Sequence, residues 1–365
     1  MLSGAIFAFL APACYARNLD IDVTSSVTMA YDDNITYSSN DRLGDFVTSL
    51  EAGLVLMQKG ETHQLSLQTD IIEEIFADHG NFDNTAEDLK FDYKQDFSEH
   101  DHLELKENLT HSYEPTSFDD AFGRTTGRYS TLDNQAGLSY THDLTEQLSA
   151  EAHYDNTVDA YSHNGPINSI LHQAGTKVNY TWDSANIFDV SYDYFRRLFQ
   201  NGPGATVNSL LTGVRHYFTA QFYTDIGAGG DFISNFDGKN SIEPHYAGAL
   251  TDQVDKNDQV SLTFEKKDST DDYSEVLFNS WRTAFNFDRQ ISQKLNTTLN
   301  VFYGQGHYSD SMISEKFTGV QAQLNYAINP KAKLGVGYSY SDSDSNNGGL
   351  SYRKNYYYLN VTIQF

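Results

Sequence analysis

The feature that most constrains this chain is the strict alternation of its C-terminal stretch, residues 356–365. Side chains in a β-strand point alternately to opposite faces. Five apolar or aromatic side chains therefore share one face, with polar side chains between them; the five are Tyr357, Leu359, Val361, Ile363 and Phe365. An exposed edge strand of this kind invites aggregation in water. The apolar face must meet either a partner strand or an apolar solvent.

The same alternation recurs inside the chain. In 295–303 (LNTTLNVFY) and 320–328 (VQAQLNYAI), apolar residues occupy every second position. A helix would instead group apolar residues three and four positions apart. Such segments are separated alternately by short connections and by longer loops rich in Asp, Asn, Gly and Ser. This plan is typical of a transmembrane β-barrel.

The connections predict how many strands the barrel has. We interpret eight short segments as tight turns: 59–61, 98–101, 143–146, 183–186, 218–220, 255–258, 291–294 and 329–331. The longer loops include 33–44, 77–87, 114–127, 162–170, 200–208 and 341–351. Eight turns between nine hairpins predict an all-β fold, a transmembrane antiparallel up-and-down β-barrel of 18 strands with both termini on the short-turn side. The strands near 242–254 and 259–271 are the least regular, so 16 strands is the alternative.

Composition excludes two other classes of chain. The protein has 365 residues, a formal net charge of −26 and 14% aromatic residues. A disordered acidic polymer would carry far fewer aromatic residues. No interior stretch approaches the roughly 18 consecutive apolar residues of a membrane helix. Because no linker or change in composition marks a second domain, we expect a single barrel over residues 17–365.

Residues 1–16 are expected to be a secretory signal peptide. The apolar stretch that begins at Ala5 ends in small residues, and Cys14-Tyr15-Ala16 resembles a signal-peptidase site before Arg17. The usual basic segment is missing, so a truncated or misplaced start is the alternative to a complete leader. The single cysteine lies in this leader, so the mature chain would have neither disulfides nor thiol chemistry.

Two stretches resemble a known family. Ala30–Asn40 (AYDDNITYSSN) and Tyr113–Tyr129 (YEPTSFDDAFGRTTGRY) are similar to the β-barrel porin families of Gram-negative outer membranes, which are often encoded beside exopolysaccharide genes. Residues 356–365 likewise resemble the assembly signal that outer-membrane machinery recognises on barrels. The resemblance implies a pore or an export barrel in the cell outer membrane, and it implies no particular functional residues.

The alternation also predicts which charged residues point inward. A barrel of this size is wide enough for an aqueous channel. Rings of charge inside it can set ion preference, and the alternative is that they are wetted residues making cross-strand pairs. The candidate pore-lining residues carry both signs and are Glu51, Asp70, Lys90, Asp92, Lys94, Glu104, Lys106, Glu151, Lys177, Asp189, Arg197, Glu265, Arg282 and Lys333.

We therefore expect an outer-membrane, porin-like channel that passes small hydrophilic solutes or a secreted polysaccharide. The alternative is a structural or adhesive barrel whose acidic extracellular loops bind partners and whose lumen is plugged, with 114–127 as the candidate plug. We expect no enzyme, because Asp119-Asp120, the nearest candidate for a catalytic pair, is a common arrangement in an acidic loop.

The expected partners follow from the location and the charge. They are outer-membrane lipid and lipopolysaccharide, the barrel assembly machinery, which would bind the C-terminal strand, and polysaccharide-export components. A field of negative sign repels nucleic acid and favours cations at the mouth. We expect no cofactor and no metal site.

Overall fold

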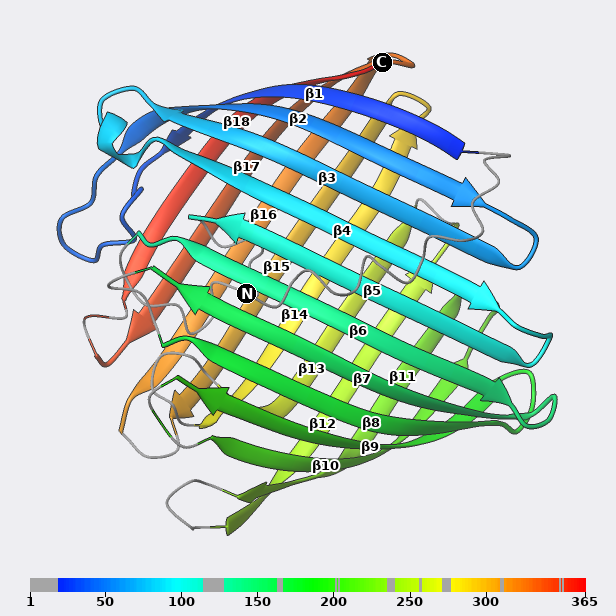
Figure 1. The fold of residues 1–365 in the computed structure, drawn as a ribbon. Helices are drawn as coiled ribbons and strands as arrows, with labels where there is room; N and C mark the ends of the chain where they lie inside the picture. The colour runs from blue at the N-terminus through cyan, green and yellow to red at the C-terminus, as the bar shows by residue number, and fades with distance from the viewer. Residues whose placement is uncertain are drawn as a thin grey trace.

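The computed structural model describes residues 19–113, 128–162, 167–200, 202, 204–234, 240–255, 258–270, 277–308, 312–347, 349 and 351–365. In these residues the chain forms 18 strands that belong to one closed sheet (Figure 1). The strands are β1 (Leu19–Asp32), β2 (Asp45–Lys59), β3 (His63–Phe76), β4 (Asn84–Asp96), β5 (Asp101–Ser112), β6 (Thr131–Asp143), β7 (Leu148–Tyr161), β8 (Ser169–Thr181), β9 (Asn186–Phe199), β10 (Ala205–Tyr217), β11 (Phe222–Ser234), β12 (Asn240–Gln253), β13 (Gln259–Thr270), β14 (Leu277–Ser292), β15 (Leu295–Tyr308), β16 (Ser314–Asn329), β17 (Ala332–Ser345) and β18 (Tyr352–Gln364). A 3₁₀ turn, η1 (Gly80–Phe82), lies between β3 and β4. Among the described helices, none has the length and apolar character needed to cross a membrane.

The C-terminal strand closes the barrel by pairing with the first strand. The β1–β18 ladder runs from the Thr24–Gln364 pair to the Asp32–Tyr356 pair. Every strand pairs antiparallel with its neighbours in the chain, and β1 pairs with both β2 and β18. None of the 18 described strands is left as an open edge, which a bilayer would not tolerate. The predicted barrel of 18 strands is confirmed, and the alternative of 16 strands is wrong.

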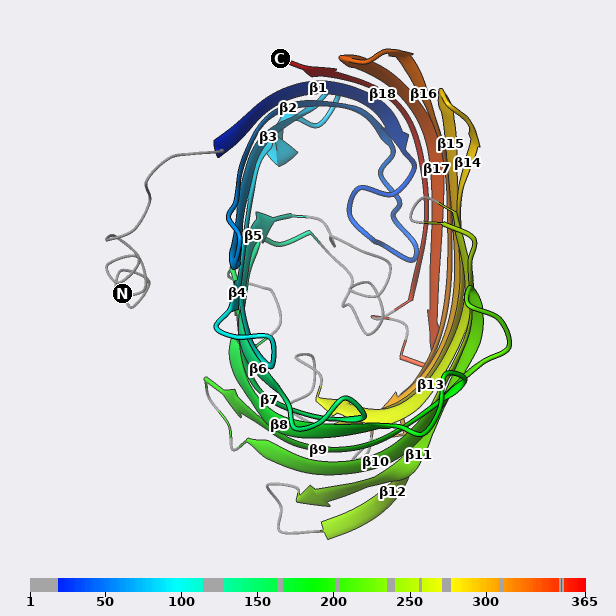
Figure 2. The same ribbon diagram turned by 90° about the vertical axis from the view of Figure 1, so that its right-hand side faces the viewer.

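The two rims of the barrel differ in their connections (Figure 1). Short turns such as 60–62 and 330–331 lie at the same rim as the start of β1 and the end of β18. The longer loops lie at the opposite rim, as the sequence predicts for an outer-membrane barrel. Seen along the barrel axis, the cross-section is an oval with β14–β18 on one side and β3–β7 on the other (Figure 2).

Four predicted loops are shorter than the sequence suggested. β4 begins at Asn84, β8 begins at Ser169, β10 begins at Ala205 and β17 continues to Ser345. The strands have 12 to 16 residues, whereas about 9–11 residues cross a bilayer. Their outer ends therefore extend beyond the membrane, where both faces can be polar. This explains why the polar stretch 341–345 remains paired with β16 although it reads as a loop.

The alternation of faces follows the predicted phase. In β15, Leu299 and Val301 lie on the face opposite to Asn300, which pairs with Gln321 inside the barrel. The C-terminal strand places Leu359 on the outer face, where 47% of the residue's surface is exposed in the isolated chain. These exposed apolar side chains form the outer surface of the barrel, and their contact with lipid stays a prediction.

The β12–β13 contact is the least regular part of the wall. The ladder between these strands ends at the Tyr246–Lys266 pair, so residues 240–245 pair only with β11. Pro244 lies inside β12 but within this half-paired stretch. Proline lacks an N–H group, so it is tolerated only where a ladder hydrogen bond is missing.

The position of a side chain on the outer or inner face predicts how the barrel tolerates a charge. Val190, near the middle of β9, is on the outer face and 49% exposed, and its neighbour Ser191 faces inward. We expect Val190→Lys to destabilise the barrel by about 2–4 kcal/mol, because it places an ammonium group in hydrocarbon. Ser191→Lys should cost about 1 kcal/mol or less. Denaturant unfolding in lipid vesicles measures both, and equal costs would contradict the assigned faces.

Candidate functional site

The inner face of the barrel is the candidate site, and the register identifies its residues. Side chains directly opposite each other in an antiparallel ladder lie on the same face. Ser26 donates a hydrogen bond of 2.7 Å to Glu51, and both line the internal cavity. Following the register from this pair around the barrel places all the candidate pore-lining residues on the inner face; they are Glu51, Asp70, Lys90, Asp92, Lys94, Glu104, Lys106, Glu151, Lys177, Asp189, Arg197, Glu265, Arg282 and Lys333. Their role in permeation stays a prediction.

Many of these charges are paired with a neighbouring charge on the same strand or on the adjacent one. The Glu104 carboxylate forms ion pairs of 2.8 Å with Lys94 on the neighbouring strand and with Lys106 on its own strand. The Arg282 guanidinium lies 3.4 Å from Glu265. Such partly exposed pairs stabilise a protein by about 1 kcal/mol or less each. The inner face of β3–β9 is therefore rich in charged side chains, many of which are neutralised by a neighbour of opposite charge. We call this surface the charged wall.

Glycines on the inner face make room for carboxylates. A Cβ atom added at these glycines would collide with an aspartate oxygen from the neighbouring strand, so each carboxylate lies back against the wall. The pairs are Gly53 with Asp70, Gly137 with Asp155, Gly175 with Asp193 and Gly213 with Asp189. The glycines thereby keep these aspartates out of the middle of the lumen.

The opposite wall has a different character. Three consecutive rows of inner side chains across β15–β18 contain no charged residue. We call these 12 residues the uncharged patch: Asn300, Gln321, Ser339 and Tyr356; Thr298, Gln323, Gly337 and Tyr358; Asn296, Asn325, Gly335 and Asn360. The sequence analysis singled out charged residues only, so it missed this surface. The alternating amides of 320–328 were the signal that could have revealed it.

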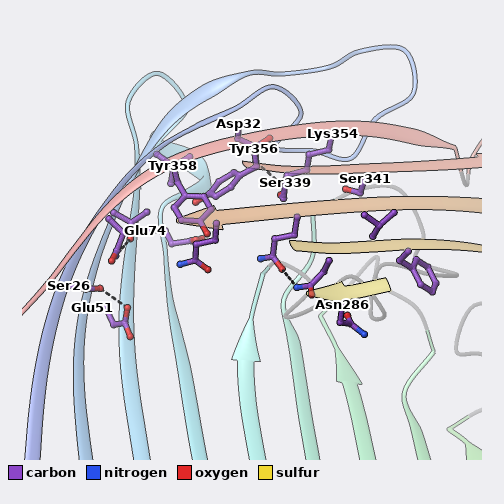
Figure 3. A pocket seen from close by; sticks show the side chains of 18 of the residues that line it. Ser26, Asp32, Glu51, Glu74, Asn286, Ser339, Ser341, Lys354, Tyr356 and Tyr358 are labelled. Carbon is purple, nitrogen blue, oxygen red and sulfur yellow. Dashed lines mark hydrogen bonds and ion pairs between the residues drawn. The ribbon is translucent and has the colours of Figure 1, made fainter. Parts of the chain in front are cut away.

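A cavity of about 800 Å³ lies inside the barrel against β1–β3 and β13–β18. Its lining includes much of the uncharged patch, the hydroxyl groups of β1, and Glu51 and Glu74 from β2 and β3. Figure 3 shows Tyr356 and Tyr358 directed into this space, with Glu74 and Glu51 on the side of the blue and cyan strands. The lining therefore mixes polar groups with apolar side chains such as Val47, Phe76 and Phe302, and it comes from β1–β3, loop 33–44 and β13–β18.

The loop 33–44 folds into the outer mouth of the barrel (Figure 2). Asn34 is fully buried, and its side-chain amide donates hydrogen bonds to the carbonyl oxygens of Ser38 at 2.9 Å and Arg353 at 2.8 Å. The Asp33 carboxylate accepts hydrogen bonds from the main-chain and side-chain nitrogens of Asn355 at 2.6 and 2.7 Å. The loop is therefore held to β18.

Tyr37 is the apolar anchor of this loop. It is 4% exposed and has a positive φ of 50°, a conformation that costs a non-glycine residue about 1–3 kcal/mol. Its ring packs on Tyr352 with centroids 5.1 Å apart, and the Lys354 ammonium lies 4.2 Å from the ring centroid. Burial and the cation–π contact offset the strained backbone. The sequence predicted only a polar loop here, although Ile35 and Tyr37 within it were a signal of burial.

The predicted plug, 114–127, and the Asp119-Asp120 pair lie outside the described residues, as do residues 1–16 of the expected signal peptide. In the part of the chain that the structure describes, no three His, Cys, Asp or Glu side chains are grouped to hold a metal ion.

The closed barrel, its apolar outer face and its polar interior define the class as a transmembrane β-barrel with porin architecture. Residues 261–365, from β13 to the C-terminus, match the family described as Putative beta-barrel porin 2. The match covers less than a third of the chain, and it confirms the predicted resemblance to β-barrel porins. Family and fold together indicate the outer membrane.

Solved structures show the same fold. The crystal structure of Pseudomonas aeruginosa OpdK with vanillate superposes with a TM-score of 0.51 at 9% identity, covering 95% of this chain and 99% of that one. Acinetobacter baumannii OccAB4 gives a TM-score of 0.50 at 13% identity, covering 95% and 98%. At such low identity the similarity extends to the fold alone. Among curated protein sequences, none matches this chain.

The anchoring of loop 33–44 can be tested at a buried ion pair. Lys354 lies 2.7 Å from Asp32, and both side chains are buried. We expect Lys354→Gln to cost about 3–5 kcal/mol, because it leaves a buried carboxylate without its cation. The measurements are denaturant unfolding and limited proteolysis, which should cut within 33–44 faster than in the wild type.

Lys333→Gln is the matched control. Lys333 also faces inward, and it makes no ion pair with any residue in the described ranges. It should leave both stability and cleavage unchanged. Unaltered proteolysis of the Lys354→Gln variant would show that the ion pair does not hold the loop.

Proposed function

We propose that this protein is an outer-membrane channel through which small hydrophilic solutes diffuse, with a preference for cations. The observation that carries the proposal is the cavity inside a closed barrel of 18 strands, whose lining includes many polar side chains. Hydroxyl, amide and carboxylate groups line this cavity, so a hydrated solute exchanges water contacts for equivalent protein contacts. Loop 33–44 narrows the mouth, and the cavity remains beside Tyr37.

The excess of carboxylates supports the preference for cations. The inner face of β2–β4 carries seven carboxylates and three lysines. The carboxylates are Asp45, Glu51, Asp70, Glu74, Asp88, Asp92 and Asp96, and the lysines are Lys59, Lys90 and Lys94. The whole chain carries a formal charge of −26. A pore lined mainly by one sign of charge raises the local concentration of the opposite ion.

A narrower form of the proposal is the export of a secreted polysaccharide. The uncharged patch supports it, because a polymer rich in hydroxyl groups needs hydrogen-bonding partners along its path. The plugged, adhesive barrel is the competing function, and it has no support from the described loop 33–44, beside which the cavity persists.

Single-channel recording in a planar bilayer tests the channel. We expect the folded protein to give steady current steps and, in a KCl gradient, a reversal potential of the sign for cation preference. The combined Glu51→Gln and Asp70→Asn variant should shift the reversal potential towards zero, because it removes two inner carboxylates. Glu61→Gln, in an exposed turn at the rim, is the control that should not. Folded protein that carries no current, or one that prefers anions, would contradict the proposal.

A further inference from the structure

We propose that the uncharged patch is a binding track for uncharged saccharides, and that Tyr358 is its stacking platform. The inference rests on the proposed channel function and names the solute class that one wall of the channel selects. It assigns different solutes to the two walls of the lumen.

The first argument is the absence of charge over a continuous surface. No row of the uncharged patch carries a carboxylate, an ammonium or a guanidinium group, although the facing wall carries many. Ions interact more favourably with the charged wall than with this patch. A neutral solute gains from hydrogen bonds that do not compete with strongly hydrated charges.

The second argument is the hydrogen-bonding capacity of the amides. A carboxamide both donates and accepts, as sugar hydroxyl groups do. The Asn300 amide donates to the Gln321 oxygen at 3.1 Å, and this bond leaves the nitrogen of Gln321 as a donor for a solute. Gln323 donates to Asn325 at 3.1 Å, and its own oxygen remains an acceptor. The amides orient each other and retain groups for a ligand.

The third argument is the position of the Tyr358 ring. A Cβ atom at Gly337, the cross-strand neighbour of Tyr358, would collide with the ring. The ring therefore lies against the backbone of β17, and its side chain borders the cavity (Figure 3). Tyr356 lies beside it, with ring centroids 5.8 Å apart and a tilt of 41°. An aromatic face next to amide groups suits a sugar ring, which has an apolar C–H face and a polar edge.

Asn360 extends this arrangement along β18. Its amide nitrogen donates a hydrogen bond of 2.7 Å to Thr28, and its oxygen accepts one of 2.9 Å from Thr362. Asn360 is thus fixed by β1 and by its own strand, on the same inner face as Tyr358. Fixed side chains lose little conformational entropy when a solute binds.

Block of the ion current by a neutral sugar tests the inference. The full chain in a planar bilayer is titrated with maltotriose, and the reduction of the KCl current gives a dissociation constant. We expect Tyr358→Ala to weaken this binding by about fivefold or more, the size of effect that one aromatic contact produces. Gly337→Ala, which must displace the same ring without removing it, should also weaken binding.

Two controls separate the possible results. Tyr326→Leu removes a tyrosine from the outer face of β16 and should leave the sugar block unchanged. Lys90→Gln, on the charged wall, should change ion selectivity and not the dissociation constant for maltotriose. If conducting Tyr358→Ala channels bind maltotriose as the wild type does, or the wild type shows no block, the binding track is wrong while the channel stands. If the folded wild type carries no current, the channel function itself is wrong.

Discussion

The whole structure depends on the need to satisfy every backbone hydrogen bond in a medium without water. A strand in a bilayer needs a partner on both sides, and the chain meets this demand by pairing its last strand with its first. The ladder brings Thr28 beside Asn360 although 332 positions separate them in the chain. Closure also creates the interior, because the same alternation that directs Leu359 outward directs Tyr358 into the lumen.

The order of strands around the barrel separates two kinds of inner surface. Because each strand pairs with its neighbour in the sequence, β15–β18 form one continuous wall, and β3–β7 of the charged wall lie across the lumen from it (Figure 2). A run of amide-rich strands in the sequence thus becomes an uncharged patch, and a run of charged strands becomes the facing wall. Glycines serve both walls, since Gly53 lets Asp70 lie back and Gly337 lets Tyr358 do the same.

At the outer mouth, contacts with strand β18 fix the conformation of loop 33–44. Loop 33–44 begins directly after Asp32, whose carboxylate binds Lys354 on β18. Two of its side chains, Asn34 and Tyr37, then meet the same strand through hydrogen bonds and ring packing. The constriction is therefore an extension of the strand pairing that closes the barrel, and the two features share residues on β1 and β18.

The sequence by itself determined the class of fold and the face on which each side chain of a regular strand lies, and it favoured 18 strands over 16. It could do so because period-two alternation is a local property, visible in segments such as 295–303 without knowledge of the partner strand. It could not determine where strands end beyond the membrane, as 341–345 shows, because polar residues on both faces look alike in a loop and in a wetted strand. Only the tertiary structure decided that loop 33–44 folds inward and that Tyr358 lies over Gly337. Those contacts join residues that are distant in the chain or on different strands, and their geometry exists only after the barrel has closed.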